Sequence, residues 1–172
     1  MPRYVAFLRG VSPMNLKMAD LKSCLEAAGL RNVRTLLSSG NVAFDTARAA
    51  TDAALEKKCE AAMQSSLGRS FYTIVRPQAE LAALVDSDPF AKHDVPADAK
   101  RVVTFMREAP PKKVKLPMSL DGATCIALEG RELLSAYTRS ESGPVFMALI
   151  EKNFGKDLTT RTWDTVRKCS VA

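Results

Sequence analysis

The order of strand and helix patterns in residues 1–76 restricts the fold of this chain more than any other feature. Short β-branched and aromatic runs, which favour strands, alternate with longer segments whose apolar side chains recur as in an amphipathic helix. The order strand, helix, hairpin, helix, strand is that of the split βαβ or ferredoxin-like arrangement, with two helices on one face of an antiparallel sheet. The predicted strands are 3–9, 33–37, 42–44 and 71–75, and the predicted helices are 18–28 and 51–67.

Capping residues mark the ends of both predicted helices. Gly29 and Gly68 follow the last apolar position of each helix, where glycine readily adopts the left-handed conformation that ends a helix. Thr51 precedes the second helix and is a favourable N-cap residue. Together with the strand that follows, these signals predict that the first unit closes near residue 76.

Residues 77–172 predict a second α+β unit, so the chain is expected to divide into 1–76 and 77–172. No sequence repeat is detectable between the two parts. The predicted elements of the second part are helices at 77–85, from Pro144 to Gly155 and at 159–168, and strands at 102–106, 124–128 and 132–137.

Composition excludes several classes of protein. Apolar residues make up 47% of the 172 residues and charged residues 26%, a balance typical of globular domains rather than disordered chains. No apolar run is long enough to span a bilayer, and no secretory signal pattern precedes the first strand. We therefore expect a cytoplasmic protein without a membrane partner.

The cysteines and the single histidine argue against a metal centre. The cysteines at 24, 59, 125 and 169 are widely spaced and form no C-x-x-C pair, so we expect reduced structural thiols. His93 is the only histidine, which excludes a site with several histidine ligands. Carboxylates are dispersed, and P-loop, G-x-G-x-x-G and H-E-x-x-H motifs are absent. The sequence thus predicts no metal and no cofactor.

The net charge of +6 is concentrated in the first part of the chain. Residues 1–76 hold 11 basic and 6 acidic residues, whereas residues 77–172 hold 14 and 13. Such a surplus permits an anionic partner, either a small molecule or a nucleic acid. A solvated basic surface without any partner has the same composition, so both interpretations stay open.

Five segments in a fixed order span nearly the whole chain. They are Leu8-Arg9-Gly10-Val11, Lys17-Met18-Ala19-Asp20-Leu21, Val33-Arg34-Thr35, Ser38-Ser39-Gly40-Asn41-Val42 with Phe44, and Thr159-Thr160-Arg161-Thr162-Trp163-Asp164-Thr165-Val166. Together they resemble the bacterial domain-of-unknown-function family 1697. The resemblance implies an α+β architecture of two ferredoxin-like halves with antiparallel sheets. It implies no substrate and no catalytic residue, which leaves an uncharacterised protein of unknown function.

The predicted sheet of the first part brings three loops to one edge. The third strand of a ferredoxin-like sheet lies between the first and second and runs antiparallel to both, so the end of the first strand, the hairpin and the start of the first helix meet. Free N–H groups at a helix start, a glycine turn and two cations form a candidate anion site. Its candidate ligand-binding residues are Arg9, Gly10, Asn15, Lys17, Ser39, Gly40 and Asn41.

A purely structural interpretation of these residues stays open. In it, Gly40 supplies the turn conformation, Ser39 or Asn41 bonds the local backbone, and Arg9 pairs with a carboxylate. Both interpretations require the same residue types at the same positions.

The C-terminal segment adds one more candidate. We expect Trp163 to anchor the final helix onto the second unit, because a lone tryptophan buries a large area; stacking on a ligand ring is the alternative. Arg161 nearby then either projects outward and binds an anion or caps a neighbouring carbonyl.

Two functional hypotheses follow. Val42 and Phe44 share one face of the third strand, so the exposed aromatic platform of an RNA-recognition sheet is missing. We expect non-catalytic binding of an anionic ligand, a nucleotide or a nucleic-acid backbone, at the edge that carries Arg9 and Gly40. The alternative is a small-molecule enzyme with an active site between the two halves.

Overall fold

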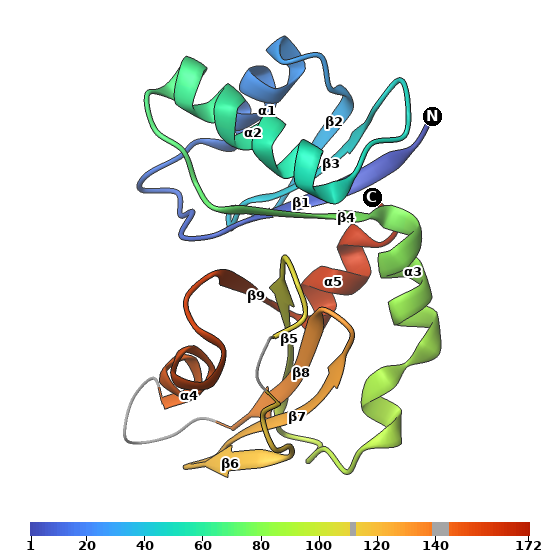
Figure 1. Ribbon diagram of the computed structural model, residues 1–172, viewed down its shortest axis with the longest axis vertical. Helices are drawn as coiled ribbons and strands as arrows, with labels where there is room; N and C mark the ends of the chain where they lie inside the picture. The colour runs from blue at the N-terminus through green and yellow to red at the C-terminus, as the bar shows by residue number, and fades with distance from the viewer. Residues whose placement is uncertain (111–112, 139–144) are drawn as a thin grey trace. The chain divides into compact units, whose positions relative to one another are not determined.

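The computed structural model describes residues 1–110, 113–138 and 145–172 (Figure 1). The fold is α+β with two antiparallel sheets, as the sequence predicts. The predicted start of a helix at Pro144 lies outside the described residues.

The chain forms two compact units whose boundary lies beyond the predicted position at 76/77. Unit 1 comprises Met1–Asp86 and Arg167–Ala172, and unit 2 comprises Ser87–Val166. Unit 1 retains the last residues of the chain because Gln78 Nε2 donates to the carbonyl oxygens of Cys169 (3.2 Å) and Ala172 (2.6 Å). Hydrogen bonds between residues far apart in the sequence thus tie the last residues of the chain to unit 1.

Unit 1 has the predicted ferredoxin-like topology. Its four strands pair in the order β2-β3-β1-β4, every pair is antiparallel, and α1 and α2 cover one face (Figure 1). The elements are β1 (Arg3–Leu8), α1 (Met18–Ala27), β2 (Arg31–Leu36), β3 (Asn41–Asp45), α2 (Asp52–Leu67), β4 (Thr73–Pro77) and α3 (Gln78–Ser87).

The predicted helix signals of unit 1 are confirmed. Thr51 Oγ1 accepts a hydrogen bond from the amide of Ala54 (3.1 Å), as an N-cap does. Gly68 ends α2 in the left-handed conformation with φ +72°, and Gly29 follows α1 with φ +93°. Local chemistry therefore fixes these helix ends.

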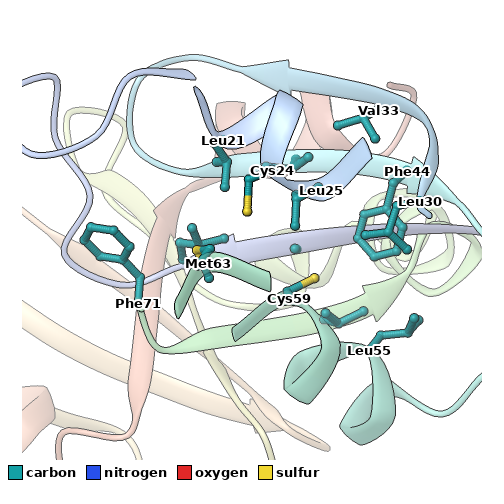
Figure 2. Packing of buried hydrophobic residues seen from close by; sticks show 14 of the residues in the cluster. Leu21, Cys24, Leu25, Leu30, Val33, Phe44, Leu55, Cys59, Met63 and Phe71 are labelled. Atoms are coloured by element: carbon teal, nitrogen blue, oxygen red, sulfur yellow. The ribbon is translucent and has the colours of Figure 1, made fainter. Parts of the chain in front are cut away.

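The core of unit 1 lies between its two helices and the sheet (Figure 2). Leu21 and Leu25 from α1 and Met63 from α2 are almost completely buried over Phe44 of β3. The cysteines at 24 and 59 belong to the same cluster as small apolar side chains. Because this packing follows the predicted apolar stripes, it explains why the sequence pattern identified the unit.

Unit 2 contains a five-stranded antiparallel sheet in the order β6-β7-β8-β5-β9. Helix α4 packs on one of its faces, over an apolar cluster that includes Leu133, Leu149 and Ile150. The elements are a short 3-10 turn (Pro89–Lys92), β5 (Lys100–Met106), β6 (Met118–Leu120), β7 (Ala123–Glu129), β8 (Glu132–Tyr137), α4 (Val145–Phe154), β9 (Leu158–Thr162) and α5 (Trp163–Cys169).

The prediction of one helix over 159–168 is wrong. The first part of this segment is the edge strand β9, and a helix begins only at Trp163. Three of its residues, Thr159, Thr160 and Thr162, are β-branched, and pairing with β5 gives them the extended conformation that such residues favour. The three-residue strand β6 was not predicted, because so short a segment carries no periodic signal.

The two sheets share strand order and register. Without β6, the order β7-β8-β5-β9 repeats β2-β3-β1-β4. Val5 of β1 pairs with Ala43 and Arg76, and Val103 of β5 pairs with Leu134 and Arg161. The residues of β1 therefore have one-to-one equivalents in β5.

The backbone hydrogen bond between the end of β1 and the neighbouring hairpin has a counterpart at the end of β5. The amide of Leu8 donates to the carbonyl of Gly40 (2.9 Å), and that of Met106 donates to the carbonyl of Arg131 (3.1 Å). Unit 2 is thus a structural counterpart of unit 1 at the level of individual residues.

Candidate functional site

The loop that follows β1 is held in shape by Asn15. Its Oδ1 accepts a hydrogen bond from the amide of Ser12 (2.9 Å), and its Nδ2 donates to the carbonyl of Gly10 (2.8 Å). Gly10 has φ +79°, in the left-handed region that glycine tolerates. Asn15 thereby closes the loop that leads into α1.

The β2–β3 hairpin uses Gly40 and Asn41 for its own construction. A Cβ on Gly40 would lie 2.9 Å from Cβ of Leu8, and the residue has φ +85°, so only glycine fits. Asn41 is fully buried, and its Nδ2 donates to the carbonyl of Leu36 and to Oγ of Ser39, both at 3.0 Å. These contacts agree with the structural interpretation of the hairpin.

The predicted cations differ in their environments. Arg9 follows β1 directly, is half-buried, and its amide donates to the carbonyl of Tyr72 (2.8 Å). Lys17 is exposed at the N-cap position of α1, and its side chain makes no capping hydrogen bond. Lys17 therefore leaves the first amides of α1 without a side-chain cap.

An open hollow of about 310 Å³ lies at the start of α1. The positively charged Lys17 and Arg69 and the carboxylate of Asp20 line it, together with apolar atoms. The other lining residues are Pro13, Met14, Asn15, Leu16 and Leu67. The hollow therefore combines two cations with the beginning of a helix, a pairing that suits an anion.

Arg69 is a lining residue that the sequence analysis missed. It follows Gly68, and its guanidinium carbon lies 4.6 Å from the centre of the Phe71 ring. Leu8 at the end of β1 pairs with Thr73 at the start of β4, so the turn before β4 lies at the edge of the sheet where β1 ends. The topology alone would have placed Arg69 beside the predicted loops.

Arg161 belongs to unit 2, whereas the other seven predicted ligand-binding residues belong to unit 1. It is only 8% exposed, and its Nη1 donates to Oγ1 of Thr159 (2.6 Å) and to the carbonyl of Thr160 (2.8 Å). Of the two predicted positions of this side chain, the structure has the one that bonds a neighbouring carbonyl.

Trp163 has the predicted packing role. It is 7% exposed, and its ring meets the ring of Phe90 edge-on, with centroids 5.1 Å apart. Both residues belong to unit 2. The indole therefore anchors the start of α5.

The cysteines are unsuited to nucleophilic chemistry. All four are free and buried. Burial raises the pKa of Cys59 to about 12 and also raises the pKa of Cys24, so both thiols are protonated at neutral pH. Within the described residues, no three His, Cys, Asp or Glu side chains gather in a way that would hold a metal ion.

Comparison with known proteins identifies the family. Residues 1–133 match the family described as "Protein of unknown function (DUF1697)". The chain belongs to the DUF1697 family. The match includes the hollow and all predicted ligand-binding residues of unit 1, but it ends before Arg161. Membership in DUF1697 assigns no activity, so the function of the chain is unknown.

A solved structure supports the fold. A conserved bacterial protein from Streptococcus pneumoniae superposes with a TM-score of 0.70 at 19% sequence identity, covering 99% of this chain and 97% of that protein. At this identity the likeness shows a common fold and no more. The search of curated proteins returned no match. In the part of the chain that the structure describes, each helix is too short or too polar to cross a membrane.

Proposed function

We propose that this DUF1697 chain binds the phosphate groups of an anionic ligand, a nucleotide or a nucleic-acid backbone, in the hollow at the start of α1. The observation that carries the proposal is that Lys17 and Arg69 line one hollow of about 310 Å³. Cations that converge on a concave surface raise the local concentration of anions. A non-catalytic, cytoplasmic binding module is the corresponding role.

The start of α1 supports this proposal. The first amides of a helix have no partner within the helix, and the helix dipole favours negative charge there. Lys17 makes no side-chain cap, so a ligand would meet these amides directly. Asp20 also lines the hollow and repels a phosphate placed beside it. A nucleotide suits this mixed lining because its ribose hydroxyls can donate to the carboxylate while the phosphates face the cations.

The other residues predicted at this edge of the sheet support the proposal indirectly. Asn15 lines the hollow and bonds the loop that leads to it, whereas Arg9, which follows β1, is not among the residues that line it. Gly40 and Asn41 hold the hairpin beside that loop. The alternative function, an enzyme with an active site between the halves, stays a prediction.

The proposal is tested by titrating the full chain at low salt with ATP, with pyrophosphate and with a short single-stranded oligonucleotide. Charge-assisted hydrogen bonds contribute about 1.5–3 kcal/mol, so Lys17→Met and Arg69→Met are each expected to weaken binding roughly tenfold or more. Lys22→Met is the matched control, because Lys22 is exposed on the same helix outside the hollow. Equal affinity in all three variants, or no binding of any probe by the parent, would rule the proposal out.

A further inference from the structure

A second open hollow lies in unit 1, away from the hollow at the start of α1. Its volume is about 350 Å³, and the two hollows have no lining residue in common. The residues that line it come from the segment before β2, the segment after β3 and the first turns of α2. Arg31 of β2 and Arg3 of β1 both pair with Asp45 at the end of β3. The second hollow therefore lies where β1 begins, whereas the first lies where β1 ends.

The lining of the second hollow is mainly apolar. Leu30 and Leu55 line it and are only 4% and 3% exposed, as members of the core cluster of unit 1 (Figure 2). Ala47, Ala50 and Ala54 also line it. Sites for small molecules are typically concave and lined by such apolar groups, with a few polar groups that fix the orientation of the ligand. A ligand with an apolar part would gain here by leaving water.

The charges at the second hollow are all positive. Arg48 and Lys58 line it, and among the described residues no Asp or Glu does. Both cations are exposed, and Lys58 is on the same face of α2 as Ala54, four residues earlier. Within the described part of the chain, neither of these side chains forms an ion pair. The first hollow contains Asp20, whereas the second attracts an anion without repulsion from its own lining.

Hydrogen bonds give the segment between β3 and α2 a fixed shape. The amide of Thr46 donates to the carbonyl of Pro2 (3.0 Å), and Oγ1 of Thr46 donates to the carbonyl of Arg48 (2.6 Å). The amide of Ala50 donates to the hydroxyl of Tyr4 (3.0 Å), which in turn donates to the carbonyl of Ala50 (3.1 Å). A wall that is ordered before binding lowers the entropy cost of taking up a ligand.

We propose that the second hollow binds a small organic acid, with one carboxylate held by Arg48 and Lys58 and an aliphatic or aromatic body against the apolar lining. The guanidinium of arginine matches the geometry of a carboxylate, and the lysine ammonium adds a point charge. Inorganic phosphate would leave Leu30 and Leu55 uncovered, and a neutral hydrocarbon would use neither cation. This site is independent of the phosphate-binding function proposed for the first hollow.

NMR titration of the full nitrogen-15-labelled chain with octanoate and with benzoate tests the site in the parent protein. The amides of residues 46–50 and 54–58 are expected to shift and saturate, whereas those of residues 13–17 are expected to change little. Acetate lacks the apolar body and octanol lacks the charge, so each is expected to bind at least about tenfold more weakly than octanoate. The absence of saturable shifts with both acids, or shifts confined to other residues, would refute the proposal.

Substitutions separate the two cations from the general positive charge of unit 1. Arg48→Gln and Lys58→Gln are each expected to weaken octanoate binding about three- to tenfold. Lys57→Gln is the matched control, because Lys57 is exposed on the same helix and does not line the hollow. Lys17→Met is also expected to have no effect, since Lys17 lines only the first hollow. Equal losses in the Lys57 and Lys58 variants would overturn the proposal.

Filling the hollow tests the contact with the apolar body of the ligand. Ala47 lines the hollow and is exposed, so Ala47→Trp is expected to prevent octanoate binding without a clear change in melting temperature. The net charge stays the same in this variant, so a loss of binding reports the occupied space alone. Parent-like affinity of a folded Ala47→Trp variant would show that the acid does not enter the hollow and would contradict the proposal.

Discussion

At the scale of single residues, the side chain of Asp45 in β3 bonds residues of both neighbouring strands, β1 and β2. Its Oδ1 accepts a hydrogen bond from Nη1 of Arg3 (2.8 Å), and its Oδ2 accepts one from Nδ2 of Asn32 (2.6 Å). Asn32 has φ +47° at the irregularity in the pairing of β2 with β3. The carboxylate therefore fixes the place where β2 departs from regular register.

The same contacts predict the effect of pH on stability. The hydrogen bond from Asn32 and then the one from Arg3 hold the pKa of Asp45 below its ordinary value of 3.8. A carboxyl whose pKa is lowered by folding stabilises the protein above the unfolded pKa, and this contribution disappears as the pH falls through the folded pKa. Asp45→Asn is therefore expected to lower the urea midpoint at pH 6, and the difference from the parent is expected to shrink below pH 3.8.

Urea titrations of both proteins at several pH values measure this difference. The side chain of Asp45 is partly solvent-exposed, so the effect is expected to be small, as for other surface ion pairs. Glu26→Gln, an exposed substitution on α1, is the control for loss of one negative charge. A deficit of Asp45→Asn that is constant from pH 6 to pH 2 would show that the charge of Asp45 is not responsible.

At the scale of secondary-structure elements, charged side chains form hydrogen bonds with backbone groups of the edge strands β4 and β9. The amide of Val75 in β4 donates to Oε2 of buried Glu56 (3.0 Å), and Nη1 of buried Arg76 donates to the carbonyl of Val75 (3.1 Å). In β9, Arg161 bonds the carbonyl of Thr160 in the same way. Unpaired backbone N–H and C=O groups at a sheet edge can otherwise pair with a strand of another chain. This contact gives Arg161 a structural role at the position that Arg76 holds in unit 1.

The start of α5 depends on Trp163. Its contact with Phe90 predicts that Trp163→Ala destabilises the protein by about 3–5 kcal/mol, as large aromatic truncations in cores do. Trp163→Phe keeps an aromatic ring and is expected to lose clearly less. Thermal unfolding measures both variants. Because Trp163 is the only tryptophan, its emission in the parent reports this site alone and is expected to be blue-shifted. Emission like that of free tryptophan would contradict the buried position.

Local chemistry explains which elements the sequence predicted correctly. Thr51, Gly29 and Gly68 act within a few residues of their own positions, so their roles follow from sequence. The strand β9 forms only because β5, far away in the chain, offers a pairing edge. The position of Arg69 before β4 follows from the predicted strand order, but no motif around Arg69 marks it as a residue of the hollow. Roles that act within a few residues can thus be read from the sequence, whereas the conformation of β9 depends on a partner strand far away in the chain.

At the scale of the whole molecule, the sequence also does not reveal the structural repeat between the two units. Arg3, Val5 and Phe7 of β1 correspond in register to Arg101, Val103 and Phe105 of β5. Outside this strand pair, Arg76 of β4 and Arg161 of β9 are also equivalent, and unit 2 has strand β6 before β7 where unit 1 has helix α1 before β2. Register therefore preserves an equivalence that the amino-acid sequence barely retains.

The uneven charge of the molecule leads to a prediction about salt. Residues 1–76 hold 11 basic residues against 6 acidic ones, and Lys17 and Arg69 are among them. Each phosphate that a cation neutralises on a single strand contributes about −0.7 to the slope of log K against log salt. If Lys17, Arg69 and Arg9 each neutralise one phosphate, the slope for an oligonucleotide is expected to be about −2. Fluorescence anisotropy of a labelled strand between 50 and 200 mM salt, the range over which this effect is large, measures it.

Removing one cation separates backbone contact from nonspecific attraction. Lys17→Met is expected to reduce the slope by about 0.7, whereas Lys22→Met on the same helix is expected to leave it unchanged. Equal reductions in both variants would mean that the whole basic surface attracts the strand and that the hollow makes no phosphate contact of its own. Binding of ATP that is tighter than binding of the oligonucleotide at each salt concentration, and that Lys17→Met weakens, would instead identify a nucleotide as the ligand.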